Sequence, residues 1–214
     1  MALRVFGLTG GIGSGKSAAA ARLRARGLPV VNADELARVA VVPGSETLAQ
    51  LVEYFGPGIL KLDGELDRPK LGGIVFSDPE ARRALDRMVH PTVRALASER
   101  FAALAERGEP LACYEVPLLY ESGLEKTYSP VVVVNAPDAQ RKPRLAARDG
   151  LDSRQVEARI AAQMPLPEKV RRAEYVIEND ATLAELERRA DAVFDALCHS
   201  LAIDPARYPR PLAN

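Results

Sequence analysis

A glycine-rich stretch near the N-terminus constrains this chain more than any other feature. Residues 10–17 read GGIGSGKS and fit the phosphate-binding loop pattern G-x-x-x-x-G-K-[ST]. An apolar, strand-like run precedes it at residues 3–8, and an alanine- and leucine-rich run that favours a helix follows at residues 17–26. A strand, a glycine loop and a helix in this order are what the pattern requires. The alternative is a glycine turn that carries an incidental lysine.

Each part of this loop suggests a contact with a nucleotide phosphate. Glycines allow a tight turn whose backbone N–H groups point inward, and these donors hold phosphate oxygens together with the positive end of the following helix. Lys16 adds a charge near the β- and γ-phosphates, and the Ser17 hydroxyl is placed to bind Mg²⁺. The predicted nucleotide-binding residues are Gly11, Ile12, Gly13, Ser14, Gly15, Lys16, Ser17 and Ala18.

Composition argues against several classes of protein. The 214 residues carry 29 basic and 29 acidic side chains, so bulk charge gives no reason to expect a nucleic-acid partner. Cys113 and Cys198 form no C-x-x-C pair and imply neither a zinc site nor a disulfide framework. We expect no signal peptide and no membrane-spanning run. The composition therefore favours a cytoplasmic α/β protein, and it leaves the oligomeric state open.

Four further strand-like runs follow the glycine loop, separated by helical stretches. The run at 130–134 is rich in valine, which is typical of a strand buried on both faces of a parallel sheet. Alternation of strands and helices predicts an α/β fold with a parallel sheet. The four runs occupy residues 28–31, 111–116, 130–134 and 175–178.

Two carboxylates are expected at the ligand-binding edge of this sheet. Ligands of parallel α/β sheets bind beyond the carboxyl ends of the strands. Asp34 follows the second strand, so we expect it on the same edge as the glycine loop, although it could instead be a helix N-cap. Glu115 ends the third strand and could hold a magnesium-bound water or be an ordinary strand-end carboxylate.

Residues 43–107 contain helices and turns but no good parallel strand. The stretch is longer than a simple crossover, which predicts an inserted helical substrate domain; the alternative is a plain helical cover for the sheet. His90-Pro91 is expected to interrupt a helix, because a residue before proline is pushed out of helical geometry and proline suits the first turn of a new helix.

A basic segment follows the fourth strand, at residues 140–159. Arg144 and Arg148 lie four residues apart and so share a helix face, where they could clamp a transferring phosphoryl group in a closing lid. The alternative is a solvated basic face, partly paired by Glu157. Residues 135–138 superficially match the N-K-x-D guanine reader of GTPases but lack the lysine, and we interpret them as a strand-to-helix turn.

The C-terminal part is predicted to close the fold with one long helix. Thr182 and Glu185 have the spacing of a capping box, and the apolar residues that follow recur on one side, so the helix should pack on the sheet. The tail after Asp204 contains three prolines and is expected to be loosely ordered.

Several strings in this order resemble the dephospho-CoA kinase family over roughly residues 5–195. The glycine loop alone would indicate only a nucleotide-binding protein, whereas the His-Pro, Pro-Leu-Leu and Arg-Asp-Gly strings narrow the family. The matching strings are LTGGIGSGKS from residue 8, ADELAR from 33, LDR from 66, IVFSDP from 74, HP from 90, PLLYE from 117, Arg144 with ARDG from 147, QMP from 163 and VIEN from 176.

The resemblance implies a fold, an activity and a division into domains. The fold is the P-loop fold of nucleoside monophosphate kinases, with a five-stranded parallel sheet, an inserted helical domain and a lid. The activity is transfer of the ATP γ-phosphoryl group to the ribose 3′-hydroxyl of dephospho-CoA. The expected domains are a core at 1–42, 108–136 and 173–204, a helical CoA-binding domain at 43–107 and a lid at 137–172.

The resemblance also implies roles for single residues. Lys16, Asp34, Arg144 and Arg148 would be catalytic, ATP would be bound with Mg²⁺ as its cofactor, and Ser17 would contact the metal. Asp34 would accept or orient the proton of the attacking hydroxyl. The residues expected to bind dephospho-CoA are Asp67, Arg68, His90 and Glu121.

Five positions depart from the usual pattern of that family. Asn32 and Glu115 stand where Asp is usual, Ala18 where Thr is common, and Asp180 where Gly is usual. Pro143 is unexpected beside Arg144 and predicts a shifted start for the lid helix. Other interpretations remain: a related small-molecule kinase, a GTPase-like switch, or an ATP-binding scaffold without catalysis.

Overall fold

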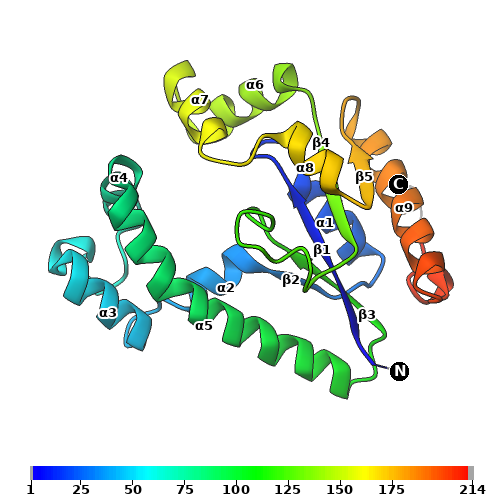
Figure 1. The fold of residues 1–214 in the computed structure, drawn as a ribbon, viewed down its shortest axis with the longest axis horizontal. Coiled ribbons are helices and arrows are strands. Elements are labelled where there is room, and N and C mark those ends of the chain that lie inside the picture. The colour runs from blue at the N-terminus through cyan, green and yellow to red at the C-terminus, as the bar shows by residue number, and fades with distance from the viewer. Residues whose placement is uncertain (1, 212–214) are drawn as a thin grey trace. The chain divides into compact units, whose positions relative to one another are not determined.

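The computed structural model describes residues 2–211 and divides into two compact units (Figure 1). One unit contains the chain up to Val31 and again from Leu104 onward, and the other contains Asn32–Ala103. The predicted helical insertion at 43–107 thus falls mostly within the second unit, while residues 32–42, which we assigned to the core, belong to the helical unit as well.

A five-stranded sheet with the order β2-β3-β1-β4-β5 forms the centre of the first unit. The β1 strand pairs in parallel with β3 and β4, and β4 pairs in parallel with β5. The predicted α/β fold and its five strands are confirmed. Their bounds are β1 Arg4–Gly10, β2 Val30–Asn32, β3 Leu111–Glu115, β4 Val131–Asn135 and β5 Tyr175–Glu178.

The register brings the carboxyl ends of β1 and β3 to the same edge of the sheet. Leu8 lies opposite Glu115 on one side and Val132 on the other, so the glycine loop after Gly10 leaves the sheet beside the end of β3. All residues of β3 are buried, as are the four valines of β4. The prediction that the valine strand is buried on both faces agrees with this burial.

In residues 2–211, the first unit also contains the helices α1 and α6 to α9, the end of α5 and a short 3₁₀ helix after α9. Helix α9 packs with α1 over the sheet, where Phe194 and Leu23 join Phe6 and Ile177 in one buried cluster, which confirms the predicted packing of the last helix. The bounds are α1 Lys16–Ala25, α6 Asp138–Asp149, α7 Ser153–Ala161, α8 Leu166–Arg172, α9 Leu183–Ser200 and η2 Pro205–Arg207.

The helical unit contains α2, α3, a 3₁₀ turn, α4 and most of α5. Leu48 and Leu51 of α3, Ile59 of the turn and Leu71 of α4 are among its buried residues. The bounds are α2 Ala33–Val39, α3 Glu46–Phe55, η1 Pro57–Ile59, α4 Arg68–Ser77 and α5 Pro79–Glu106.

Helix α5 runs without interruption through His90-Pro91, so the predicted break is wrong. A proline inside a helix removes one backbone hydrogen bond and crowds the preceding turn. Buried residues lie on both sides of the proline, with Ala84 before it and Val93 and Ala97 after it. We attribute the continuity of the helix to this packing, which offsets the local cost of Pro91.

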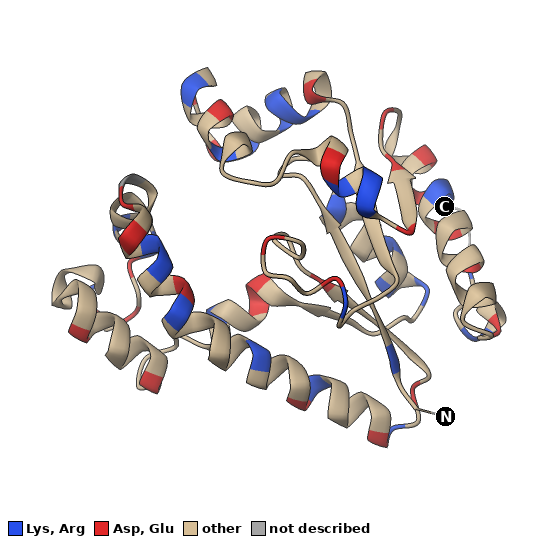
Figure 2. Ribbon diagram, viewed as in Figure 1, with Lys and Arg blue, Asp and Glu red and all other residues tan. Residues whose placement is uncertain are grey.

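Helix α6 likewise tolerates Pro143. It begins at Asp138 and continues to Asp149, so the start of the helix is not shifted toward the proline as we had expected. Arg141 and Leu145, on either side of Pro143, are both buried. Figure 2 marks in blue the positions of basic residues along this helix and α7.

Two predictions for the C-terminal part need correction. Thr182 caps α9 by accepting a hydrogen bond from the Glu185 N–H, but the Glu185 carboxylate binds Arg188 and Arg189 instead of closing a capping box. The described part of the tail is held in place: Tyr208 is buried, and its carbonyl accepts a hydrogen bond from Arg26 Nε at 2.9 Å. Residues 212–214 of the predicted tail lie outside the described residues. Among residues 2–211, none of the helices has the length and apolarity that crossing a bilayer demands.

Candidate functional site

The glycine loop joins β1 to α1 and is built on two left-handed residues. Gly13 has φ +78° and Gly15 has φ +92°, conformations that cost glycine little and other residues more. Gly15 directly precedes α1, and Lys16 and Ser17 occupy its first turn. The sequence therefore places the loop and the start of the helix as the phosphate-loop pattern predicts.

Three side chains from distant parts of the chain hold the loop backbone from outside. Arg141 Nε donates to the Ile12 carbonyl at 3.0 Å, and the Ile12 N–H donates to Gln163 Oε1 at 2.9 Å. Asn179 Nδ2 donates to the Ser14 carbonyl at 2.8 Å. We call Arg141, Gln163 and Asn179 the loop clamp. Because two loop carbonyls are bound by the clamp, they cannot swing inward toward an anion.

The loop clamp also explains the glycines. A Cβ atom on Gly11 would lie 2.7 Å from a guanidinium nitrogen of Arg141, and one on Gly13 would lie 2.9 Å from its carbonyl oxygen. A Cβ on Gly15 would collide with the amide nitrogen of Asn179. Close approach of clamp residues therefore requires the small residues that the loop pattern supplies.

Arg141 contacts the glycine loop, and our sequence analysis did not single it out. We had interpreted the basic segment through Arg144 and Arg148, whereas Arg141 is the buried arginine of α6. Burial lowers the pKa of its guanidinium, and the Asp138 carboxylate at 2.8 Å partly offsets this effect. In the sequence analysis, Gln163 and Asn179 appeared only within the strings that resemble the family. Contacts between residues so distant in sequence leave no local pattern that could have identified them.

Lys16 is held by a carboxylate at the end of β3. Its Nζ lies 2.7 Å from Glu115 Oε1, and Arg24 NH2 lies 3.3 Å from Glu115 Oε2. The Glu115 side chain is only 1% exposed. The strand-end carboxylate therefore pairs with two cations and orients the loop lysine; whether it also holds a metal-bound water stays a prediction.

The hydroxyls of the loop have different surroundings. Ser17 is exposed in the first turn of α1, whereas Ser14 is fully buried and its Oγ has no hydrogen-bond partner among the described residues. Ala18 packs against the buried cluster that α1 and α9 form with the sheet. Of these side chains, Ser17 alone is placed at the loop exit with its hydroxyl accessible, as a metal ligand would need.

Asp34 is not the N-cap of its helix. Asn32 caps α2, and its Oδ1 accepts hydrogen bonds from the N–H groups of Asp34 at 2.8 Å and Glu35 at 3.2 Å. The Asp34 side chain is exposed. The capping alternative is therefore wrong, and the substitution of Asn for the usual Asp at position 32 preserves the cap, since both residues are good N-caps.

The predicted dephospho-CoA contacts in the helical unit are spread over two helices. Asp67 caps α4 by accepting from the Lys70 N–H at 3.1 Å, and Arg68 is exposed at the first position of that helix. His90 lies on α5, with Nε2 at 3.6 Å from Asp86 Oδ1. Their roles toward a ligand stay predictions.

The two predicted lid arginines differ in their partners. Arg144 donates to the Gln140 side chain at 2.9 Å, while Arg148 forms two hydrogen bonds with Asp149, at 2.7 and 3.0 Å. Arg159 binds the same carboxylate, and the pKa of Asp149 is lowered chiefly by its hydrogen bond with Arg148. Arg144 thus has no carboxylate partner in the described residues, whereas Arg148 does.

Glu121 connects the segment after β3 to the start of α8. Its carboxylate accepts from the Met164 N–H at 2.8 Å and from Lys169 Nζ at 3.1 Å. Lys169 is fully buried and also donates to the Pro117 carbonyl at 3.0 Å. Burial lowers the pKa of Lys169, and the adjacent Glu121 opposes that shift. These bonds fix Gln163, the neighbour of Met164, beside the loop.

Comparison with known proteins gives a consistent picture. A family model described as dephospho-CoA kinase matches residues 4–185. A dephospho-CoA kinase of Anaeromyxobacter dehalogenans is 52% identical over 189 residues, which is 88% of this chain and 90% of the relative. A crystal structure from Thermus thermophilus is 42% identical with a TM-score of 0.78, and covers 92% of this chain and 99% of its own. A dephospho-CoA kinase from Campylobacter jejuni is 27% identical with a TM-score of 0.69, and covers 92% and 98%.

Proposed function

The chain belongs to the dephospho-CoA kinase family, whose reaction transfers the γ-phosphoryl group of ATP to dephospho-CoA, and we propose which of its residues carry that reaction. The observation that carries the proposal is the clamped glycine loop. Its carbonyls at Ile12 and Ser14 are bound from outside, and Lys16 stands at the start of α1. Such a loop suits the phosphates of a nucleoside triphosphate.

The loop N–H groups and Lys16 would hold ATP, and Mg²⁺ would be bound through the Ser17 hydroxyl. Mg²⁺ prefers oxygen ligands and keeps several waters, so one protein hydroxyl with phosphate oxygens and water is a sufficient set. The accessible side chain of Ser17 fits that requirement. When bound, Mg²⁺ neutralises charge on the β- and γ-phosphates. ATP binding would replace Glu115 as the partner of Lys16.

The acceptor, dephospho-CoA, would be bound by the helical unit, which we propose as the CoA-binding domain. Asp34 would accept or orient the proton of the attacking 3′-hydroxyl, since its exposed carboxylate takes no part in capping α2. Asp67, Arg68 and His90 are proposed contacts of dephospho-CoA. Glu121, in the other unit, would contribute by holding Lys169 and the backbone of Met164 in place.

Residues 137–172 would act as a lid over the nucleotide. Phosphoryl transfer asks the protein mainly for positioning and for stabilisation of charge. Arg144 would neutralise the charge that develops on the γ-phosphoryl group, with Arg148 assisting, and closure would exclude water and so limit wasteful ATP hydrolysis. We also propose the cytoplasm as the place of the reaction, where ATP is available.

ADP release by purified protein with Mg²⁺-ATP tests the function. The reaction is run with and without dephospho-CoA, with AMP and gluconate as alternative acceptors and Lys16→Ala as the blank. ADP release only with dephospho-CoA, and its loss in the blank, is the expected result. Preferential use of AMP or gluconate would overturn the acceptor, and ATP binding without turnover would favour a switch or scaffold.

The proposed role of Asp34 has its own test. Asp34→Asn keeps the size of the side chain but removes the charge that accepts a proton. We expect kcat to fall far more than the affinity for ATP changes. An unchanged kcat would remove Asp34 from the mechanism.

A further inference from the structure

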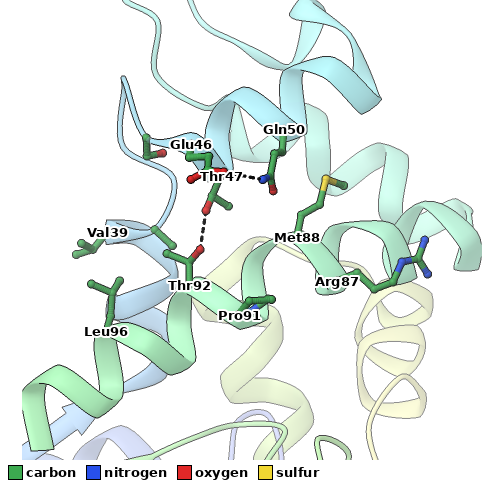
Figure 3. Close-up of a pocket in the computed structure, with 11 residues that line it drawn as sticks. Val39, Glu46, Thr47, Gln50, Arg87, Met88, Pro91, Thr92 and Leu96 are labelled. Carbon is green, nitrogen blue, oxygen red and sulfur yellow. Dashed lines mark hydrogen bonds between the residues drawn. The ribbon is translucent and has the colours of Figure 1, made fainter.

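A cavity of about 390 Å³ lies within the helical unit, between the end of α2, helix α3 and the middle of α5 (Figure 3). Its volume is in the range of small-molecule sites, roughly 300–1,000 Å³. None of the residues we assigned to catalysis or to substrate binding lines it. The lining residues are Val39, Ala40, Ser45, Glu46, Thr47, Gln50, Arg87, Met88, Pro91, Thr92 and Leu96.

The lining is mixed in chemistry and neutral in formal charge. The lining includes apolar side chains such as Met88 and Leu96, hydroxyl and amide groups, one acid, Glu46, and one base, Arg87. Figure 3 shows Thr47 of α3 and Thr92 of α5 directed at each other, with their hydroxyls 2.8 Å apart. Such a wall suits an uncharged chain that carries both methyl groups and amides, rather than a phosphate or an ionised group.

Pro91 adds a backbone acceptor to this wall. Proline has no N–H, so the carbonyl of Arg87, four residues earlier in α5, lacks the donor that a regular helix would supply. Both residues line the cavity. A helix carbonyl without its regular donor, on a residue that lines a cavity, is available to accept a hydrogen bond from an amide N–H of a ligand.

Helix α2 connects the cavity to the proposed catalytic base. Asp34 lies in its first turn, Arg38 lies one turn further on the same face, and Val39 and Ala40 reach the cavity. Along the axis, Val39 is about 8 Å from Asp34 at 1.5 Å per residue. Along this one short helix, a carboxylate comes first, then a cation, and then the residues that line the neutral cavity.

We propose that the cavity binds the pantetheine arm of dephospho-CoA. The inference rests on the proposed function and deepens it, because it assigns the end of the substrate that does not react. With the 3′-hydroxyl at Asp34, the diphosphate would meet Arg38 and the arm would enter the cavity. The arm is uncharged and combines a geminal dimethyl group with two amides, which matches the apolar, hydroxyl and carbonyl groups of the lining.

Two size-matched variants test the assignment. Gln50→Trp puts a large side chain at the lining, whereas Ala49→Trp puts the same side chain at an exposed neighbour on α3 outside it. We expect Gln50→Trp to raise KM for dephospho-CoA at least tenfold with no change in KM for ATP. Ala49→Trp should change neither value. Equal KM values for dephospho-CoA in the two variants would overturn the proposal.

An inhibitor that lacks the pantetheine arm shows whether Gln50→Trp only fills the cavity or damages the helical unit as a whole. AMP shares the adenosine of dephospho-CoA but has no arm, so its inhibition constant against dephospho-CoA should be the same in Gln50→Trp and in the unmodified protein. A matching loss of AMP inhibition would contradict the assignment, since the substitution would then harm more than the arm site. Failure of the unmodified protein to phosphorylate dephospho-CoA would instead refute the proposed function itself.

Discussion

Gln163 accepts a hydrogen bond from the backbone N–H of Ile12 at 2.9 Å, across 151 residues of sequence. The same peptide unit is held through its carbonyl by Arg141. The outermost part of the phosphate loop is therefore fixed by side chains of the proposed lid region and not by the loop itself. Any change in the position of these side chains is therefore expected to alter the binding of the nucleotide.

Gln163→Met should weaken ATP binding without affecting the acceptor. Methionine keeps the length of the side chain but removes the oxygen that Ile12 uses, and one lost hydrogen bond is worth about 1 kcal/mol. We expect KM for ATP to rise about fivefold, which corresponds to that energy, while KM for dephospho-CoA stays constant. Steady-state kinetics measures both.

Gln155→Met is the matched control for this substitution. Gln155 closes the capping box of α7, away from the glycine loop. It should change the stability of that helix but leave KM for ATP near its original value. An equal effect of the two substitutions would show that α7 as a whole, and not the bond to Ile12, governs ATP binding.

Glu115→Gln should destabilise the protein. The substitution removes the negative charge that pairs with Lys16 and Arg24 at a side chain that is 1% exposed. Breaking a buried ion pair leaves its partners uncompensated, and we expect the free energy of unfolding to fall by about 2 kcal/mol. Urea unfolding measures the change. Glu65→Gln breaks the surface pair with Lys61 and should have no measurable effect; a similar loss in both would contradict the argument.

Gly13→Ala should damage nucleotide binding more than Gly11→Ala. At Gly13 an added Cβ meets backbone, the carbonyl of Arg141, and φ is +78°, so neither the contact nor the conformation can relax. At Gly11 the added atom meets the end of the Arg141 side chain, which can move. We expect measurable ATP affinity in Gly11→Ala and none in Gly13→Ala by calorimetric titration. The reverse order would show that the Arg141 guanidinium is the less tolerant neighbour.

Arg144→Ala should lower kcat by about a thousandfold or more, the range found for transition-state arginines in phosphoryl transfer. Arg148→Ala should have a smaller effect, because Asp149 binds that guanidinium twice and competes with a phosphoryl group for it. Single-turnover rates with saturating ATP and dephospho-CoA separate the two. A larger loss in Arg148→Ala would transfer the main role to that residue.

Acid pH should reveal the contribution of Glu185. Hydrogen bonds from Arg188 and then Arg189 lower the pKa of its carboxyl from 4.5 to about 2. A carboxyl whose pKa is lower in the folded protein stabilises the fold above its unfolded pKa, and that contribution is lost as the pH falls. The stability difference between the unmodified protein and Glu185→Gln should therefore be constant above pH 5 and shrink between about pH 4.5 and 2. Chemical unfolding across this range measures it, and a difference independent of pH would contradict the assignment.

The sequence predicted those parts of the fold whose signals are local. All five strands and the helix after the glycine loop were recognised, because strand periodicity and the loop pattern need only neighbouring residues. The position of Asp34 after β2 and of Glu115 at the end of β3 followed from the same local reasoning. Family resemblance then supplied roles for these residues, which no local pattern could give.

Packing decided the features that local rules predicted wrongly. Pro91 should end a helix by its own chemistry, yet buried neighbours on both sides keep α5 continuous. The proline-rich tail was expected to be loose, but Tyr208 covers Phe194 and binds Arg26. Arg141 could not be told from the other arginines of its segment, because burial follows from the fold and leaves no mark in the neighbouring residues.

The loop clamp determines the stage of synthesis at which the chain can first bind a nucleotide. The glycine loop leaves the ribosome well before the residues that form its three fixing bonds, which lie at positions 141, 163 and 179. A nascent chain that ends before β5 would carry the whole GGIGSGKS string and still lack the donor for the Ser14 carbonyl. Domains generally fold as units while the N-terminal part emerges first. Nucleotide binding should consequently begin only after residue 179 has been made and has reached the loop.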